Sequence, residues 1–181
     1  LKILQTNSAS SSITIDYLSG WNMVGLPLEV EDSSVGLVFP DAIEGTLYSF
    51  DGSYTIAESL DNGTGYWLRF GSSGSSEITG AEITSLTLSL SEGWNLISGI
   101  SFTIGVENII DASNIIIDGT LYGYNGSYVS SDNLTPGAGY WLRANADGDI
   151  TLSSSQQSSK SIPKINHISN TNTLEFSNGI H

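Results

Sequence analysis

The sequence predicts an all-β protein built from two homologous small antiparallel β modules in tandem. Each module is expected to be a barrel or a sandwich of about five to six strands, with room for one short helix. Three observations predict this class: the chain repeats itself once, apolar and polar residues alternate at a period of two, and Asp-Gly and Asn-Gly dipeptides separate alternating runs. The alternation is typical of half-buried strands, and the dipeptides are typical of tight hairpin turns.

The repeat is visible in two blocks of sequence. SITIDYLSGWNMVG from Ser12 aligns with SLTLSLSEGWNLIS from Ser85 at an offset of 73 residues. GTLYSFDGSYTIAESLDNGTGYWLR from Gly45 aligns with GTLYGYNGSYVSSDNLTPGAGYWLR from Gly119 at an offset of 74, and 14 of these 25 positions are identical. Similarity of this length indicates duplication of a unit of roughly 70 residues, which is long enough for a small β domain.

The repeat divides the chain into segments. We expect residues 1–11 to form a leading strand and a Ser-rich link, residues 12–84 the first module and residues 85–153 the second. A Ser- and Gln-rich linker is expected at 154–162, followed at 163–181 by a hairpin-like segment or the start of a further module. Because the sequence begins without Met and ends on a strand-like run that has only begun, we expect the chain to be part of a larger protein.

Each module is expected to begin with two strands. The first strand alternates, and its inward residues are expected to be Ile13, Ile15 and Tyr17 in one copy and Leu86, Leu88 and Leu90 in the other. The second strand, in WNMVGL and WNLISG, is apolar on both faces and is expected to lie in the middle of its module. One or two helical turns are expected over 106–112, whereas Gly36 and Pro40 weaken that signal in the first copy.

A hairpin follows in each copy, around Asp51-Gly52 and Asn125-Gly126. We expect a two-residue type I′ turn, which needs positive φ at both central residues. Such a turn pairs Phe50 with Ser53 and Ser49 with Tyr54. This register places Leu47, Tyr54 and Ile56 on one face of the hairpin and Tyr48 and Phe50 on the other.

The motif GYWLR forms the next expected strand. Its alternation points Tyr66 and Leu68 to one face and Trp67 and Arg69 to the other. A last strand, at 77–79 or 149–152, is expected to complete each copy. The residues that we expect to form the repeated structural core are Trp21, Trp94, Tyr66, Tyr140, Leu68, Leu142, Tyr54 and Tyr128.

Composition and charge exclude several classes of function. The formal net charge is −14, from nineteen carboxylates against five Lys and Arg, so the surface repels phosphate backbones and anionic lipids. We therefore expect no nucleic acid partner and no membrane insertion. The chain has no Cys, and its two histidines, His167 and His181, lie outside both repeats, which leaves the duplicated unit without a Ser-His-acid triad or a His or Cys metal site. We expect no catalytic residues, no metal and no cofactor.

The aromatic residues carry the ambiguous signal. Trp and Tyr side chains fill the cores of small β modules, but they also form platforms that bury the apolar face of a sugar ring. The better candidates for such a platform are Trp67 and Trp141, because the two arginines of the chain, Arg69 and Arg143, share their face. Each guanidinium is expected to bridge a strand carboxylate or to stack on the Trp two residues earlier.

GWNMVGLPL, GWNLISGIS and the paired GYWLR strands resemble the GWN...GYW β modules that recur in tandem in large secreted or cell-surface proteins of bacteria and archaea. The resemblance covers residues 12 to 153 and implies extracellular, non-catalytic duty. The second copy departs from it where Gly99-Ile100 replaces the usual Leu-Pro, so the resemblance does not determine the path of the chain there.

Three functional hypotheses follow. The leading one is a structural or adhesive module, a spacer or docking element for the other domains of its parent chain. The first alternative is a carbohydrate-binding accessory module that binds polysaccharide through Trp67, Trp141 and nearby tyrosines. The second is a filament subunit, in which residues 1–7 or 164–177 add a strand to a neighbouring subunit.

Overall fold

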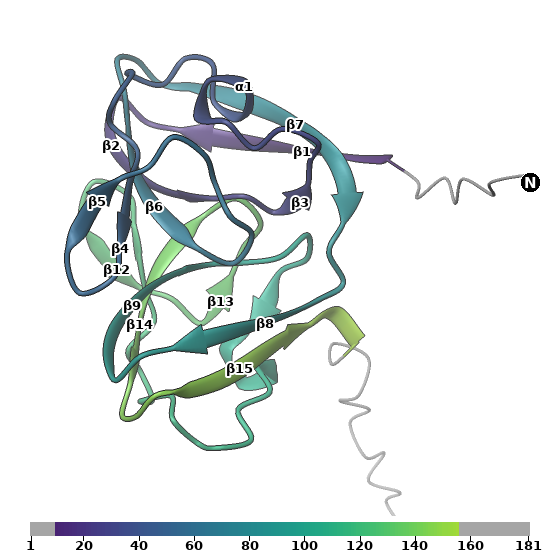
Figure 1. Cartoon of the computed structure of the whole chain (residues 1–181), viewed down its shortest axis with the longest axis vertical. Coiled ribbons are helices and arrows are strands. Elements are labelled where there is room, and N and C mark those ends of the chain that lie inside the picture. The colour runs from purple at the N-terminus through teal and green to yellow at the C-terminus, as the bar shows by residue number, and fades with distance from the viewer. Residues whose placement is uncertain (1–9, 156–181) are drawn as a thin grey trace, which may run out of the picture.

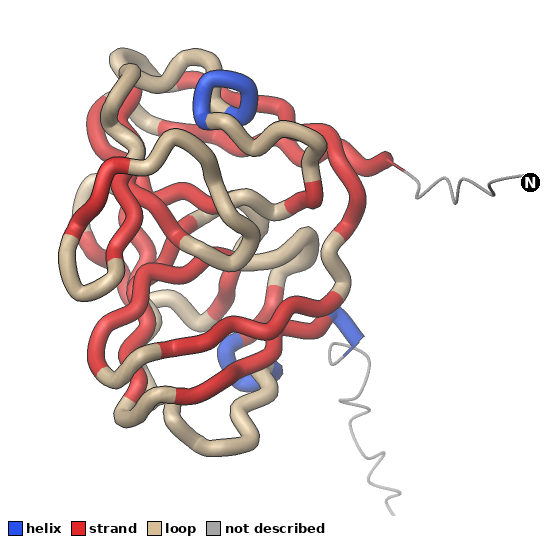
Figure 2. Tube along the Cα trace, viewed as in Figure 1, coloured by secondary structure: helices blue, strands red, loops and turns tan. Residues whose placement is uncertain are grey.

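The computed structural model describes residues 10–155 of the 181, and it is all-β, as predicted (Figure 1). Fifteen strands lie in this range, and strands and loops make up nearly all of it (Figure 2). The leading strand expected at 1–7, most of the linker expected at 154–162 and the segment 163–181 lie outside the described residues. The strand exchange expected of a filament subunit depends on these segments and is therefore not addressed by the fold.

The N-terminal half, residues 10–84, contains two antiparallel sheets. The strands of the first sheet, in spatial order, are β1 (Ser10–Tyr17), β7 (Gly74–Glu82) and β3 (Leu28–Glu29). Those of the second are β2 (Gly20–Gly25), β6 (Gly65–Phe70), β4 (Tyr48–Phe50) and β5 (Tyr54–Ile56). The first and last strands of this half pair with each other over the full length of β1.

The C-terminal half, residues 85–155, has the same main pairings. The strands of its four-stranded sheet are β9 (Gly93–Ser98), β14 (Gly139–Ala144), β11 (Tyr122–Tyr124) and β12 (Tyr128–Ser130). Two further pairs of strands are β8 (Ser85–Leu90) with β15 (Gly148–Ser153) and β10 (Ile104–Gly105) with β13 (Asn133–Leu134). The division of the chain into two tandem modules stays a prediction.

The strand number and the helices differ from expectation. Within the described residues the N-terminal half has seven strands and the C-terminal half eight, because β3, β10 and β13 are two-residue strands too short to give an alternating pattern. The α-helix α1 (Val35–Val38) forms in the first copy, where Gly36 weakened the helical signal. The second copy has only the 3-10 helix η1 (Val106–Asn108) within the range 106–112.

Each half encloses its own apolar core between a four-stranded sheet and the pair formed by its first and last strands. Tyr66 and Leu68 are buried in one core and Tyr140 and Leu142 in the other, as predicted. The inward residues of β1 and β8 contribute from the opposite side, since Ile15, Tyr17, Leu88 and Leu90 are buried. Burial of each such large apolar side chain stabilises the fold by about 1.5–3 kcal/mol.

The Asn side chain of the GWN motif holds the preceding turn by hydrogen bonds to the backbone in both halves. Gly20 and Gly93 have φ of 93° and 104°, which residues with a Cβ adopt at a cost. The Asn22 side chain accepts a hydrogen bond from Leu18 N (2.9 Å) and donates to Leu18 O (2.8 Å), and Asn95 makes the same contacts in the second copy. The following strand was expected in the middle of its module, but β2 and β9 are edge strands of their sheets.

The hairpin register differs from the prediction by one residue. Phe50 pairs with Tyr54 and Tyr48 with Ile56, so the connection contains three residues instead of two. The reason is that Gly52 and Gly126 alone adopt positive φ in these turns, whereas a type I′ turn requires it at both central residues. Because directly paired residues point to the same side of a sheet, Tyr54 moves to the face that carries Phe50.

The halves differ after β2 and β9. In the N-terminal half the chain after Pro27 forms β3, which pairs with β7. In the C-terminal half Gly99-Ile100 follows β9, no described strand corresponds to β3, and the chain continues to β10, which pairs with β13. In the N-terminal half an isolated bridge between Ser34 and Ser59 matches this last pairing, so the halves share it and differ in β3.

Backbone hydrogen bonds also join the two halves. Gly25 N donates to Gly137 O (3.0 Å), and Ser98 N donates to Gly63 O (2.8 Å). These bonds are equivalent under the sequence repeat, because 25 corresponds to 98 and 63 to 137. The backbones approach so closely that a Cβ on Gly65 would lie 2.5 Å from Ile97 O.

Candidate ligand-binding site

Pairing within the four-stranded sheets determines which side chains face away from the two cores. Trp67 on β6 lies opposite Met23 on β2 and Tyr48 on β4, so these three residues share a face. The same pattern recurs in the C-terminal half, where Trp141 lies opposite Leu96 and Tyr122. Each sheet therefore has one side that packs on its own core and an opposite side, rich in aromatic residues, that faces away from that core.

The two aromatic sides contact one another. Phe50 packs edge-to-face on Trp141, with ring centroids 4.8 Å apart and an interplanar angle of 81°. Trp67 packs on Tyr124 in the same way, at 4.8 Å and 75°. These geometries lie in the preferred range for aromatic pairs. We call this cluster of rings from both halves the aromatic surface, and its members are Trp21, Tyr48, Phe50, Tyr54, Trp67, Trp94, Tyr122, Tyr124, Tyr128 and Trp141.

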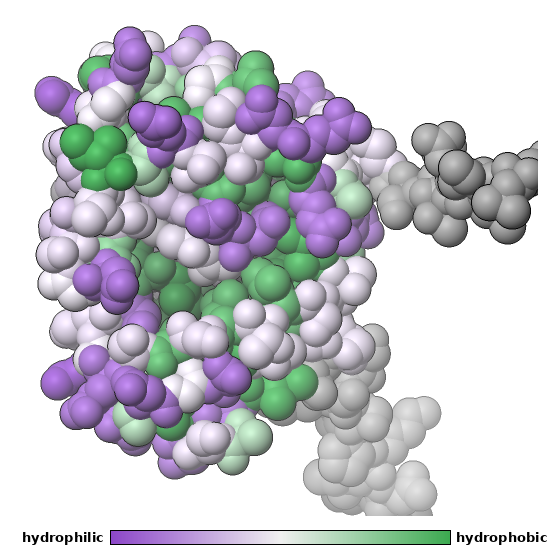
Figure 3. All heavy atoms as spheres, viewed as in Figure 1, coloured by the Kyte–Doolittle hydropathy of each residue, from purple (hydrophilic) through white to green (hydrophobic). Residues whose placement is uncertain are grey.

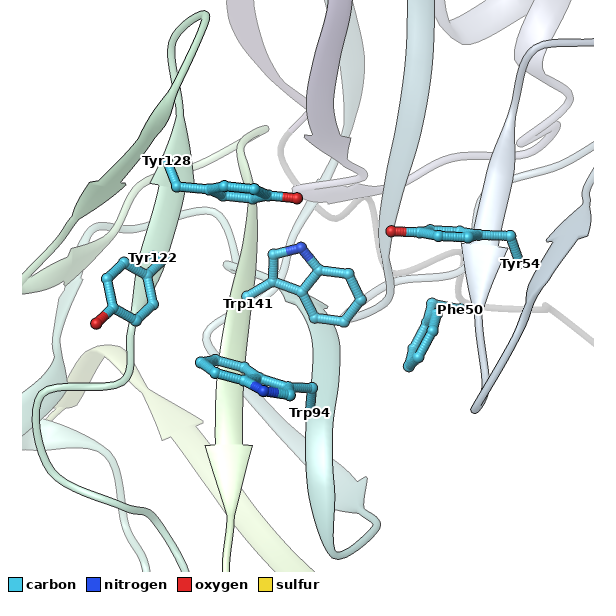
Figure 4. A pocket seen from close by; sticks show the side chains of 6 residues that line it. All are labelled: Phe50, Tyr54, Trp94, Tyr122, Tyr128 and Trp141. Carbon is cyan, nitrogen blue, oxygen red and sulfur yellow. The ribbon is translucent and has the colours of Figure 1, made fainter.

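Two pockets open on the aromatic surface. The first has a cavity volume of about 520 Å³ and is lined by Phe50, Tyr54, Trp94, Tyr122, Tyr128 and Trp141 (Figure 4). The second has a volume of about 490 Å³ and is lined by Trp21, Tyr48, Tyr54, Trp67, Tyr124 and Tyr128. Both volumes lie in the range of ordinary small-molecule sites. Tyr54 and Tyr128 belong to both pockets, so the pockets are adjacent.

The pockets are equivalent under the sequence repeat. Adding 73 to Trp21 gives Trp94, and adding 74 to Tyr48, Tyr54 or Trp67 gives Tyr122, Tyr128 or Trp141. Tyr124 in one pocket corresponds in the same way to Phe50 in the other. Each half supplies residues to both pockets, so exchange of the halves converts one pocket into the other. This is the relation of an approximate two-fold axis between them.

Four residues that we expected in the core lie instead on this surface. Trp21 and Trp94 are 41% and 43% exposed, and Tyr54 and Tyr128 are 52% and 57% exposed. The prediction of a structural core role was wrong for all four. Trp21 pairs with Arg69 and thus lies on the face opposite Tyr66 and Leu68. The two tyrosines reach the surface through the corrected hairpin register.

The residues expected to form a sugar platform are present but less accessible than these four. Trp141 is 9% exposed and Trp67 is partly buried, and both form walls of the pockets. Arg69 and Arg143 are exposed on the same face. One of the two expected arrangements placed the guanidinium of Arg143 on the ring of Trp141. The structure places it elsewhere. The guanidinium lies 6.0 Å above the ring of Trp94, the residue paired with Arg143 on the neighbouring strand.

The chemistry of the pockets is aromatic and uncharged. Among residues 10–155, their lining contains no carboxylate, amine, guanidinium or imidazole side chain, and its side-chain polar groups are tyrosine hydroxyls and indole N–H donors. The tyrosines with a raised pKa lie elsewhere: the hydrogen bond from Tyr17 to Asp41 raises the pKa of Tyr17, and burial raises that of Tyr66. The arrangement therefore offers stacking and hydrogen bonding.

Residues 10–155 contain no group of three or more His, Cys, Asp and Glu that could hold a metal ion. No helix in this part of the chain is long and apolar enough to cross a membrane. Over the face shown in Figure 3, hydrophilic residues cover much of the upper and lower parts, and apolar residues reach the surface mainly in the middle.

Sequence reasoning found the repeat of the aromatic residues but missed that rings from both halves meet. The alternation of GYWLR correctly separates Trp67 from Tyr66, and the pairing of Trp21 with Arg69 extends the same face to β2. A three-residue hairpin connection would have added Phe50 and Tyr54 to this face. Contact between the halves has no local signal, apart from glycines at 63 and 65 that recur at 137 and 139.

Comparison with known proteins found no match. No protein-family model matches the chain, and neither a curated protein sequence nor a solved structure matches it significantly.

Proposed function

We propose that this chain is a non-catalytic adhesive module of a larger extracellular protein and that its aromatic surface binds polysaccharide. The observation that carries the proposal is the pair of pockets lined almost entirely by Trp and Tyr, four of which are between 41% and 57% exposed. Exposed aromatic faces stack on the C–H faces of sugar rings, while the hydroxyl and indole N–H groups at their edges bind sugar hydroxyls.

The energetics support a binding role for these rings. An aromatic side chain has about 150–250 Å² of surface, and burial of apolar surface is worth about 25 cal/mol per Å². Trp21 and Trp94 leave a large share of this free energy unused in the protein alone, because they remain partly exposed. A ligand that covers both indoles would recover it. A module that served only as a spacer would have no need of such a surface.

The non-catalytic and extracellular parts of the proposal rest on chemistry and composition. Among the described residues, the pocket lining has no carboxylate, histidine or lysine that could act as a general acid, general base or nucleophile, and therefore no such group to activate a tyrosine hydroxyl of the lining. The acidic, Cys-free composition, rich in Ser, Thr, Asn and Gly, is typical of secreted surface proteins of bacteria and archaea. The GWN and GYW motifs resemble those of tandem surface modules.

Polysaccharide pull-down tests the proposal. The full chain is incubated with insoluble cellulose, chitin, xylan, mannan and peptidoglycan, and the bound fraction is measured for the wild type, the double variant Trp21→Ala/Trp94→Ala and the control Leu37→Ala. Leu37 is 66% exposed and lies on α1, outside both pockets. We expect at least one polysaccharide to retain the wild type and the control but not the double variant. Equal retention of all three proteins, or retention of none, would contradict the proposal.

A further inference from the structure

We propose that the two pockets are half-sites of one continuous site that holds a single chain of a neutral β-1,4-linked polysaccharide, in either chain direction. This inference rests on the proposed function and extends it, because it specifies the class of ligand, its stoichiometry and its orientation. The argument uses the continuity of the pockets, their equivalence and the absence of charge.

The pockets are continuous because both include Tyr54 and Tyr128. In Figure 4 these two side chains come from opposite sides, and their hydroxyl groups point toward one another above Trp141. Beneath them, Phe50 of one half contacts Trp141 of the other at 4.8 Å. A ligand that fills one pocket therefore contacts Tyr54 and Tyr128, which also line the other pocket.

The equivalence of the pockets favours a ligand with repeated units. Every residue that lines one pocket has its counterpart in the other, and all counterparts are identical except Phe50 and Tyr124. Two like pockets at a fixed separation bind like groups with similar affinity. A polymer presents such groups on one chain, and its second unit then binds at a high effective concentration.

The charges favour a neutral chain. The protein carries a net charge of −14, which repels anionic polymers. The described residues of the pocket lining include no carboxylate that would pair with a cationic polymer. A β-1,4-linked hexopyranose chain is a flat ribbon whose rings have apolar faces and polar edges. Its faces match the indoles, and its hydroxyls match donors such as Arg143, whose guanidinium lies beside Trp94 at the edge of the first pocket.

The two-fold relation determines the orientation. A polysaccharide chain has a direction, with one reducing and one non-reducing end, whereas the site reads the same from either end. Rotation about the approximate axis turns a bound chain end over end and exchanges the pockets. The two directions therefore make nearly the same contacts, and we expect both to be populated.

Calorimetry tests the stoichiometry. Cellobiose, cellohexaose, chitobiose and chitohexaose are titrated into the full chain. For at least one of the two series, we expect two disaccharides per protein but one hexasaccharide, with the hexasaccharide at least about tenfold tighter. Trp21→Ala and Trp94→Ala are each expected to weaken hexasaccharide binding by about tenfold and to differ by less than about threefold, because they alter equivalent pockets. Leu37→Ala is the matched control and should leave binding unchanged.

A spin label at the reducing end of the hexasaccharide tests the orientation. With the two tryptophans read as separate indole N–H signals by NMR, we expect the label to broaden both Trp21 and Trp94. Broadening of one signal alone would show a single chain direction and would overturn that part of the inference. In the Leu37→Ala control we expect the spin label to broaden the indole N–H signals of both Trp21 and Trp94, as in the wild type.

The outcomes separate this inference from the proposed function. Two hexasaccharides per protein, or a loss of binding in only one of the two Trp variants, would overturn the single continuous site and leave polysaccharide binding intact. Binding of laminarihexaose, a β-1,3-linked glucose hexasaccharide, when neither cellohexaose nor chitohexaose binds would overturn the β-1,4 class alone and leave polysaccharide binding intact. If decaproline binds and neither hexasaccharide does, the aromatic surface recognises proline-rich peptide instead, and both proposals are wrong.

Discussion

The two faces of the GYWLR strands differ in how completely they are buried. On the core side Leu68 and Leu142 have no exposed surface. Tyr66 and Tyr140, on the same face of the same strands, are 2% and 5% exposed. On the other side Trp67 and Trp141 contact rings of the opposite half but also line pockets that are open to solvent. One face is complete within its own half, and the other depends on both halves and remains partly uncovered.

The contrast between the two faces separates residues that serve folding from residues that folding does not require. The core face needs only size and shape complementarity, which its aliphatic and tyrosine residues supply. The aromatic face keeps large rings exposed at Trp21, Trp94, Tyr54 and Tyr128, although smaller polar residues would cover an edge strand or a hairpin as well. We infer that folding accounts for the first face and for the buried part of the second, where Met23, Leu96 and Trp141 form a further core cluster from both halves, and that binding accounts for the exposed rings.

The largest expected effect comes from truncation on the core face. Leu68→Ala and Leu142→Ala should each lower the free energy of unfolding by about 2–5 kcal/mol, because each removes a fully buried side chain and leaves a cavity. Urea unfolding measures this loss. Trp21→Ala, on the other face of the neighbouring strand, is the comparison. If it costs as much as Leu68→Ala, the assignment of the exposed rings to binding is wrong.

The junction between the halves is expected to be the next most sensitive region. Gly65→Ala places a Cβ 2.5 Å from Ile97 O, so the backbones must separate, and we expect a loss of about 1–3 kcal/mol. The near-ultraviolet circular dichroism of the aromatic surface should also weaken, because its rings meet across this junction. Gly71→Ala is the matched control, since no atom lies within 4 Å of its added Cβ. Equal effects of the two substitutions would show that the close contact is unimportant.

Removal of the Tyr66 hydroxyl is expected to have a smaller effect, dependent on pH. This hydroxyl accepts a hydrogen bond from Asp61 N (3.0 Å), and Tyr66→Phe leaves that donor unpaired at a cost of about 1–2 kcal/mol. Burial raises the pKa of Tyr66 above its ordinary value of 10.0. The neutral phenol therefore contributes fully below the unfolded-state pKa, and the contribution is lost as pH rises through the folded-state value.

The pH dependence gives this prediction its measurement. We expect the difference in unfolding free energy between the wild type and Tyr66→Phe to be constant near neutral pH and to shrink above about pH 10. Urea unfolding at pH 7, 9, 10 and 11 measures it. A difference that grows with pH over this range would contradict the expected sign.

Much of the fold could be predicted from sequence because its signals are local. Alternation in β1 and β8 predicts the buried Ile15 and Leu88, and the GYWLR strands predict the buried Leu68 and Leu142. The hairpins were located correctly, but their register was not, because the dipeptide Asp-Gly fits both a two-residue and a three-residue connection. The positive φ of Gly52 alone decides between them, and it becomes visible only in the folded chain.

The candidate site was harder to predict because it depends on contacts between distant segments. An apolar strand such as WNMVGL can be buried on both sides or can pack one side on a partner sheet, and the sequence is the same in both cases. Trp21 was therefore expected in the core, whereas it lies on the aromatic surface with Tyr48, at a centroid distance of 5.9 Å. The contact of Phe50 with Trp141 spans about half the chain and has no local signal.

The smallest expected effect on stability comes from the shared tyrosines of the aromatic surface. Tyr54→Thr and Tyr128→Thr keep a side chain that favours strands but remove rings that are more than half exposed, so each should cost less than about 1 kcal/mol. Thermal unfolding measures this cost. Because both rings belong to both pockets, either substitution should weaken hexasaccharide binding at both half-sites, unlike Trp21→Ala or Trp94→Ala. A large loss of stability with unchanged binding would mean that these tyrosines support the fold, and the contrast between the two faces would then fail.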